Sequence, residues 1–119
     1  LFLLALRMGR ETGVLSNREG KTLVKELIRL PHLMEETLKS SKQVAQIAKK
    51  YLHARDFLYL GRGINYPIAL EGALKLKELS YIHAEAYPAG ELKHGPLALV
   101  DDDMPVVAVA PNDREFRAK

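Results

Sequence analysis

Apolar residues recur at helical spacing through the first half of the chain. The apolar opening ends at Gly13, which predicts the last turns of a helix closed by a glycine cap. Residues 13–20 are expected to form a polar connector. Apolar residues then return every three or four positions over 21–38 and again over 41–52, which predicts two amphipathic helices. Pro31 is expected to kink or restart the first of these two helices.

The pattern changes in the second half of the chain. Residues 56–60 are apolar and aromatic and lead into a Gly-Arg-Gly tripeptide, which is typical of a buried strand that enters a tight turn. Strong helix formers over 67–81 predict a helix that begins at a proline. Residues 83–103 contain several prolines and glycines and are expected to be irregular. The apolar run at 105–110 predicts a fully buried strand.

Strand, helix, loop and strand in this order are typical of a β-α-β unit, whose two strands are parallel and joined by a right-handed crossover. The fold class is therefore α/β, with helices that lead into a parallel sheet. Two parallel strands bury too little surface to be stable alone. The chain opens without an initiator Met, and residues 111–113 are expected to cap a helix that has only begun at 114–119. We therefore expect a piece of a longer protein, truncated at both ends.

Composition and charge narrow the classes of function. The formal charge of +3 comes from 18 Lys and Arg against 15 Asp and Glu without a basic run, so nucleic acid is not an expected partner. The absence of Cys excludes a thiol nucleophile and a cysteine zinc site, and it fits a cytoplasmic location. Arg7 and Arg10 interrupt the apolar opening too early for a membrane span, and they follow the apolar run where a signal peptide would have them before it. No membrane partner is expected.

Three charged residues share one face of the predicted 67–81 helix. Glu71, Lys75 and Glu78 stand at positions i, i+4 and i+7. One interpretation is a solvated row of ion pairs. The other makes Glu78 a general base and Lys75 its electrostatic partner, because moving a proton next to a carbonyl carbon needs a carboxylate held near the substrate.

His94 is the second candidate for proton transfer. It lies between Gly90 and Pro96, in a stretch expected to be an irregular exposed loop, and an imidazole can change its charge near neutral pH. A plain surface histidine is the alternative. His83 is a weaker candidate of the same kind. The remaining two histidines, His32 and His53, are expected on helix surfaces.

No cofactor or metal is predicted. We expect neither a His-x-x-x-His nor a Glu-x-x-His pair on a helix, so a metal site is not indicated. Gly61 and Gly63 begin like a dinucleotide fingerprint, but Tyr66 stands where the third glycine would be. The two glycines still allow close approach by a substrate or by another backbone segment.

Two motifs in combination resemble one family. The segments LEGALKLKE (70–78) and GELKHGP (90–96), within a match over 61–111, closely resemble the second sugar-isomerase (SIS) module of bacterial glucosamine-6-phosphate synthases, which are isomerising glutamine–fructose-6-phosphate aminotransferases. The resemblance implies part of a flavodoxin-like parallel sheet of SIS type, flanked by helices and preceded by linker helices. The implied divisions are the end of a helix from the preceding SIS module, a helical linker and the N-terminal part of the second SIS domain, at residues 1–13, 14–54 and 55–119.

The resemblance also implies a function in amino-sugar biosynthesis. The family converts fructose 6-phosphate and glutamine-derived ammonia into glucosamine 6-phosphate. Glu78 matches the carboxylate that moves a proton between C1 and C2 of the sugar, and Lys75 matches a lysine near it. His94 matches the histidine that assists ring opening in the neighbouring subunit's site, which implies a homodimer that binds a hexose 6-phosphate.

Several catalytic parts of the family are not recognisable in this sequence. These are the glutaminase cysteine, the phosphate-binding loop and the lysine that forms a Schiff base with the sugar. Because positioning supplies much of catalysis, the isolated chain is expected to be inactive. A sugar-phosphate deglycase or a sugar-phosphate-sensing regulator with the same module is the alternative. A third possibility is a structural half-domain in which Glu71, Lys75 and Glu78 form only a surface ladder.

Overall fold

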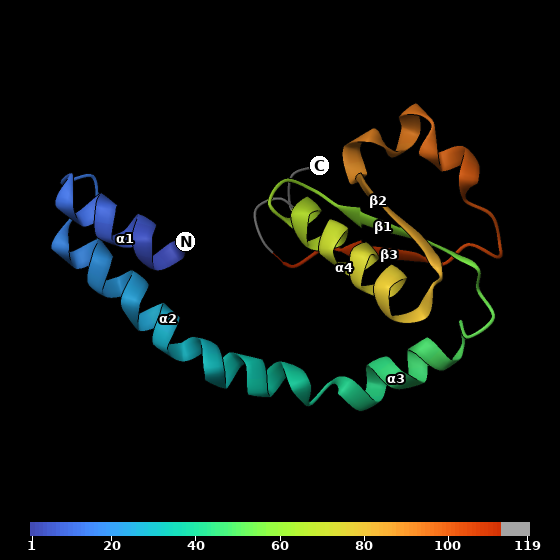
Figure 1. Ribbon diagram of the computed structural model, residues 1–119, viewed down its shortest axis with the longest axis horizontal. Helices are drawn as coiled ribbons and strands as arrows, with labels where there is room; N and C mark the ends of the chain where they lie inside the picture. Colours follow the sequence, from blue (N-terminus) through green and yellow to red (C-terminus); the bar gives the residue numbers. More distant parts are fainter. Residues whose placement is uncertain (113–119) are drawn as a thin grey trace. The chain divides into compact units, whose positions relative to one another are not determined.

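A computed structural model describes residues 1–112 of the chain (Figure 1). The chain divides into two compact units, Leu1–Ala48 and a second that begins at Lys49. The helix predicted for the end of the chain lies outside the described residues. Within the described residues, no helix combines the length and the apolar character needed to cross a bilayer.

The first unit begins with a helix pair. Helix α1 (Phe2–Glu11) ends before Gly13, whose φ of 75° is the left-handed conformation that the glycine cap predicts. Helix α2 (Asn17–Leu38) begins earlier than predicted, because Ser16 caps it. The Ser16 hydroxyl accepts a hydrogen bond from the Glu19 backbone N–H, and the Glu19 carboxylate accepts one from the Ser16 N–H. The polar connector predicted up to residue 20 is therefore too long.

Helix α2 runs through Pro31 without the restart that the sequence suggests as one outcome. Helix α3 (Ser41–Lys49) ends a few residues before the predicted boundary. The apolar face expected of α3 is exposed in this chain, with Val44 at 58% and Ile47 at 49% relative exposure. The spacing of apolar residues thus predicts these helices correctly, although their apolar faces are not buried within Leu1–Ala48.

The second unit is a parallel sheet with helices. Its elements are β1 (Asp56–Gly61), α4 (Asn65–Ser80), β2 (His83–Pro88), the 3₁₀ helices η1 (Ala89–His94) and η2 (Pro96–Leu99), and β3 (Val106–Val109). The strand order is β2-β1-β3, and β1 pairs in parallel with both neighbours. The α/β class and the parallel sheet are confirmed.

Strand β2 lies where the sequence predicts an irregular stretch, so that prediction is wrong. Its residues include two alanines, a glutamate and a proline, which are poor strand formers. Pairing with β1 along all six residues, and burial of Ala84 at 0% exposure, hold the strand in place. The sheet consequently has three described strands where the sequence predicted two.

A small core lies between α4 and the sheet. Its buried apolar residues are Leu58, Leu60, Ala69, Ala73 and Ala84. Helix α4 can approach closely because a Cβ added at Gly72 would lie 2.9 Å from the Tyr59 ring. A Cβ at Gly61 would lie 2.3 Å from the Asn65 carbonyl oxygen, so this glycine serves the approach of another backbone segment.

Strand β3 differs from the prediction of a fully buried strand. Val106 is 42% exposed and Val107 is 37% exposed. The reason is its place at the edge of the described sheet, where β1 is its one strand neighbour among residues 1–112. An apolar sequence run therefore indicates a strand here without indicating its burial.

Candidate functional site

The three charged residues predicted on one face of α4 do meet there. The Lys75 ammonium donates a hydrogen bond to the Glu78 carboxylate, with Nζ 2.6 Å from Oε2. The same Nζ lies 3.7 Å from Oε1 of Glu71. The opposite side of the helix carries the buried alanines of the core, so the packing of α4 turns this charged face outward.

The charge of Lys75 is stabilised by its neighbours. Its pKa is raised above the ordinary lysine value, chiefly by the hydrogen bond to Glu78, then by the charge of Glu78 and, more weakly, by Glu71. Lys75 therefore remains an ammonium at neutral pH. A carboxylate beside a permanently protonated lysine can remove a proton from a carbon acid. The ammonium then stabilises the negative charge that develops on a neighbouring oxygen.

His94 is the last residue of the 3₁₀ helix that follows β2. It lies in η1, and its Nδ1 is 2.8 Å from Oε2 of Glu91. Glu91 and His94 thus form a Glu-x-x-His pair on a helical turn, contrary to the expectation that no such pair occurs on a helix. The spacing is visible in the sequence, but it carries that meaning only if residues 90–94 are expected to be helical.

Glu78 and His94 lie at opposite ends of the sheet. Glu78 is in the last turns of α4, which lead into the start of β2, whereas His94 follows the end of β2. The six residues of β2, at about 3.3 Å each, span roughly 20 Å. Figure 1 shows the C-terminal end of α4 and η1 at the two ends of β2. One copy of the chain does not bring the two residues together.

The other histidines take different places. His83 begins β2, and its Nε2 lies 3.8 Å from Oε1 of Glu85. Glu85 also accepts a hydrogen bond from the Tyr87 hydroxyl, which raises the pKa of Tyr87. His32 lies on α2 as expected, whereas His53 lies in the turn after α3 and not on a helix surface.

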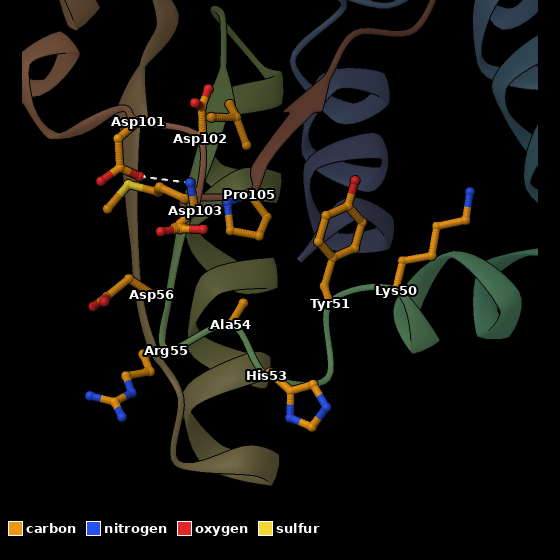
Figure 2. A pocket seen from close by; sticks show the side chains of 12 residues that line it. Lys50, Tyr51, His53, Ala54, Arg55, Asp56, Asp101, Asp102, Asp103 and Pro105 are labelled. Carbon is orange, nitrogen blue, oxygen red and sulfur yellow. Dashed lines mark hydrogen bonds between the residues drawn. The ribbon is translucent and has the colours of Figure 1, made fainter.

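A polar pocket lies at the amino ends of β1 and β3 (Figure 2). Its volume is about 720 Å³, and its lining residues with ionisable side chains other than Tyr51 are Lys50, His53, Arg55, Asp56, Asp101, Asp102 and Asp103. Parallel α/β sheets usually bind ligands at the carboxyl ends of their strands. This pocket lies at the opposite, amino ends of the strands. The pocket contains none of the predicted site residues, and residues 1–112 hold no group of three or more His, Cys, Asp or Glu arranged for a metal ion.

A parallel sheet, a glycine turn and an acid–base pair on the following helix define an α/β domain with a candidate proton-transfer site. Residues 50–119 match the family model of the SIS domain, and the chain belongs to this family.

Relatives in this family carry more specific names. The chain is 56% identical over 104 residues to a glutamine–fructose-6-phosphate aminotransferase (isomerizing) of Aquifex aeolicus, and 58% identical over 108 residues to that of Thermus thermophilus. These matches cover 87% and 91% of the chain, but 18% of the length of each relative.

A solved structure supports the same placement. The C-terminal domain of glucosamine-fructose-6-phosphate aminotransferase from Francisella tularensis is similar with a TM-score of 0.91 and 48% identity. The match covers 95% of this chain and 32% of that chain. The fold and the family expected from the two sequence motifs are thereby confirmed.

Proposed function

We propose that this chain supplies part of the sugar-isomerising site of an enzyme that makes glucosamine 6-phosphate from fructose 6-phosphate and glutamine-derived ammonia. The observation that carries the proposal is the Lys75–Glu78 pair on the exposed face of α4, with Nζ and Oε2 2.6 Å apart. The similarity to isomerising aminotransferases supports it. A cytoplasmic setting is part of the proposal, because a chain without Cys suits a reducing compartment.

Glu78 would move one proton between two carbons. After ammonia has replaced the C2 carbonyl oxygen of the open-chain sugar as an imine, the Glu78 carboxylate takes a proton from C1. The electron pair of that C–H bond forms a C1–C2 double bond while the electrons of the C=N π bond move to nitrogen, which takes up a proton. The protonated Glu78 then gives its proton to C2, and the C1 hydroxyl loses its proton as its oxygen forms the aldehyde C=O. This leaves an aldehyde at C1 and an amine at C2. Lys75 would keep a positive charge beside the electron-rich intermediate.

His94 would act in the site of a second copy of the chain. Ring opening must precede proton transfer on the same sugar, so both residues must reach one substrate. The roughly 20 Å length of β2 separates them within a copy. A homodimer in which His94 crosses to the partner's Glu78 satisfies both requirements. The domain division at residues 1–13, 14–54 and 55–119 also belongs to this proposal.

The experiment uses an intact host enzyme, because the isolated chain is expected to be inactive. The matching segment of the Aquifex aeolicus relative is replaced by this chain, and ammonia-dependent formation of glucosamine 6-phosphate is measured. Glu78→Gln in this chimera keeps the shape of the side chain and removes the base. We expect turnover to fall at least about a hundredfold, which is typical for the loss of a general base.

The matched control is Glu26→Gln in the same chimera. Glu26 pairs with Arg29 at i, i+3 spacing and 2.7 Å, as Glu78 pairs with Lys75, but it lies on α2. Its turnover should stay normal. Near-normal turnover of Glu78→Gln would mean that Glu71, Lys75 and Glu78 form surface ion pairs without a catalytic role. A chimera that makes no product while the Aquifex enzyme does would contradict the proposal for this chain.

A further inference from the structure

We propose that Glu91 is the positioning residue of His94: it holds the Nδ1–H of the imidazole and thereby makes Nε2 the atom that accepts the substrate proton. The inference rests on the proposed function, because it concerns the ring-opening step assigned to His94. It goes further by naming a residue that the sequence motifs did not single out.

The backbone of η1 brings the two side chains together. A 3₁₀ helix has three residues per turn, so side chains at i and i+3 lie directly above one another. Glu91 and His94 have this spacing, and Oε2 lies 2.8 Å from Nδ1. Gly95 follows with a φ of 146°, a conformation that other residues rarely adopt, and it ends the turn directly after His94. The pair is therefore set by local backbone geometry.

Within the part of the chain that the structure describes, the elements packed against η1 place no second carboxylate in contact with the His94 ring. Helix η1 packs against β2 and η2. Helix η2 consists of Pro, Leu, Ala and Leu, which do not titrate. At the near end of β2, the Tyr87 hydroxyl is engaged with Glu85. Lys93 is the other charged residue of η1, and it is not at i+3 or i−3 from His94. Among residues 1–112, Glu91 is the carboxylate that contacts the His94 ring.

This contact decides which nitrogen is the base. A neutral imidazole carries one N–H and one bare nitrogen. A carboxylate can only accept, so it selects the tautomer with hydrogen on Nδ1 and leaves Nε2 bare. Nε2 can then take the proton of the anomeric hydroxyl on C2. The C2–O5 bond breaks, the C2 oxygen becomes a carbonyl oxygen, and O5 receives the bond's electrons and the proton from Nε2–H. The carboxylate stabilises the imidazolium in between.

The pair is open to solvent in this chain, with side-chain exposures of 61% for Glu91 and 72% for His94. Exposed ion pairs contribute little to stability. Loss of the Glu91 carboxylate should therefore leave the fold intact, and any effect on ring opening can be assigned to the orientation of His94.

The test measures ring opening separately from amination. In the chimera, NMR exchange between the α and β furanose forms of fructose 6-phosphate reports ring opening alone. Glu91→Met keeps the length of the side chain and removes the acceptor, and we expect the catalysed exchange to fall about tenfold, less than the loss expected for a general base itself. Glu91→Gln, which can still accept, should fall between Met and Glu. Lys93→Gln, the matched control on the same turn, should exchange normally.

A spectroscopic readout completes the test. Long-range ¹H–¹⁵N spectra of histidine-labelled protein show which ring nitrogen is protonated, and the His94 signals are assigned by their loss in His94→Gln. We expect Nδ1–H in the unmutated chimera and a mixture of tautomers in Glu91→Met. Unchanged exchange and tautomer in Glu91→Met would overturn the role of Glu91. If the unmutated chimera shows no His94-dependent exchange at all, the ring-opening role in the proposed function fails first, and the two failures are distinguishable.

Discussion

The two units of this chain contain helices that are stabilised in different ways. Within Leu1–Ala48 the one buried residue is Gly20, and large apolar side chains such as Ile28 and Met34 are more than 60% exposed. The helices of this unit are stabilised by local interactions, of which the Ser16–Glu19 capping box is the clearest. In the second unit, α4 is anchored by Ala69 and Ala73, which are almost completely buried against the sheet.

This contrast separates what apolar periodicity can predict from what it cannot. The regular recurrence of apolar residues predicts α2. The apolar face that these residues form is nevertheless exposed within Leu1–Ala48. Helix α4 has a weaker stripe and is the one that builds a core. Periodicity predicts that a helix exists, whereas burial depends on which surface lies opposite. Substitutions in the two units should therefore differ in their effect on stability, and the following three test this.

The largest effect is expected for Gly61→Ala. The new Cβ would lie 2.3 Å from the Asn65 carbonyl oxygen, and backbone cannot move aside as a flexible side chain can. We expect a loss of about 3 kcal/mol or more in the free energy of unfolding of the second unit. Amide hydrogen exchange should lose protection in β1 and α4 and keep it in α2. Gly90→Ala is the control, since its Cβ would meet nothing within 4 Å. Equal losses for the two variants would refute the close approach.

Leu58→Ala should have the next largest effect. Leu58 is 2% exposed in the centre of the sheet, and removing a buried leucine leaves a cavity. The expected loss is about 2 to 3 kcal/mol, measured by urea denaturation. The matched variant is Leu79→Ala on α4, where the leucine is 82% exposed, and it should change stability by less than about 0.5 kcal/mol. Similar losses at both positions would mean that Leu79 is covered in solution.

The smallest effect is expected at the start of α2. Ser16→Ala removes the cap and should cost about 1 kcal/mol, seen as faster amide exchange in the first turn. The pKa of Glu19 is lowered, first by the side-chain hydrogen bond with Ser16 and then by its backbone bond. A carboxylate whose pKa is lower in the folded state than in the unfolded state stabilises the folded state at pH values above its unfolded-state pKa. This contribution is lost as the pH falls through the folded-state pKa. Amide exchange in the first turn of α2 should therefore become faster in the parent chain as the pH is lowered. Exchange protection that does not depend on the ionisation of Glu19 would contradict the capping box.

The fold could be predicted where local signals and tertiary packing agree. The glycine after α1, the strand β1 and the helix α4 all follow from residue types that favour the observed structure. Strand β2 could not be predicted in this way, because its alanines, glutamate and proline favour other structures and its pairing with β1 holds it extended. The start of α2 carries a recognisable sequence signal, because Ser16 and Glu19 have the Ser-x-x-Glu spacing of a capping box.

The candidate site could be predicted to the level of a helix face. Helical spacing alone places Lys75 between Glu71 and Glu78, and the distances confirm their contact. Their catalytic roles remain predictions. The Glu91 contact of His94 was missed because it depends on the segment being 3₁₀ helical, and short 3₁₀ turns have no strong sequence signal. The separation of Glu78 from His94 also depends on β2, which the sequence did not reveal.

The close approach of Gly72 to the Tyr59 ring has a consequence for the position of Glu78. The Tyr59 ring lies where a side chain at position 72 would be, because a Cβ added there would lie 2.9 Å from the ring, so a larger residue would displace either the ring or α4. A displacement of α4 would also move the Glu78 carboxylate, which lies six residues further along the same helix. The position of Glu78 therefore depends in part on a glycine that lies on the face of α4 toward Tyr59.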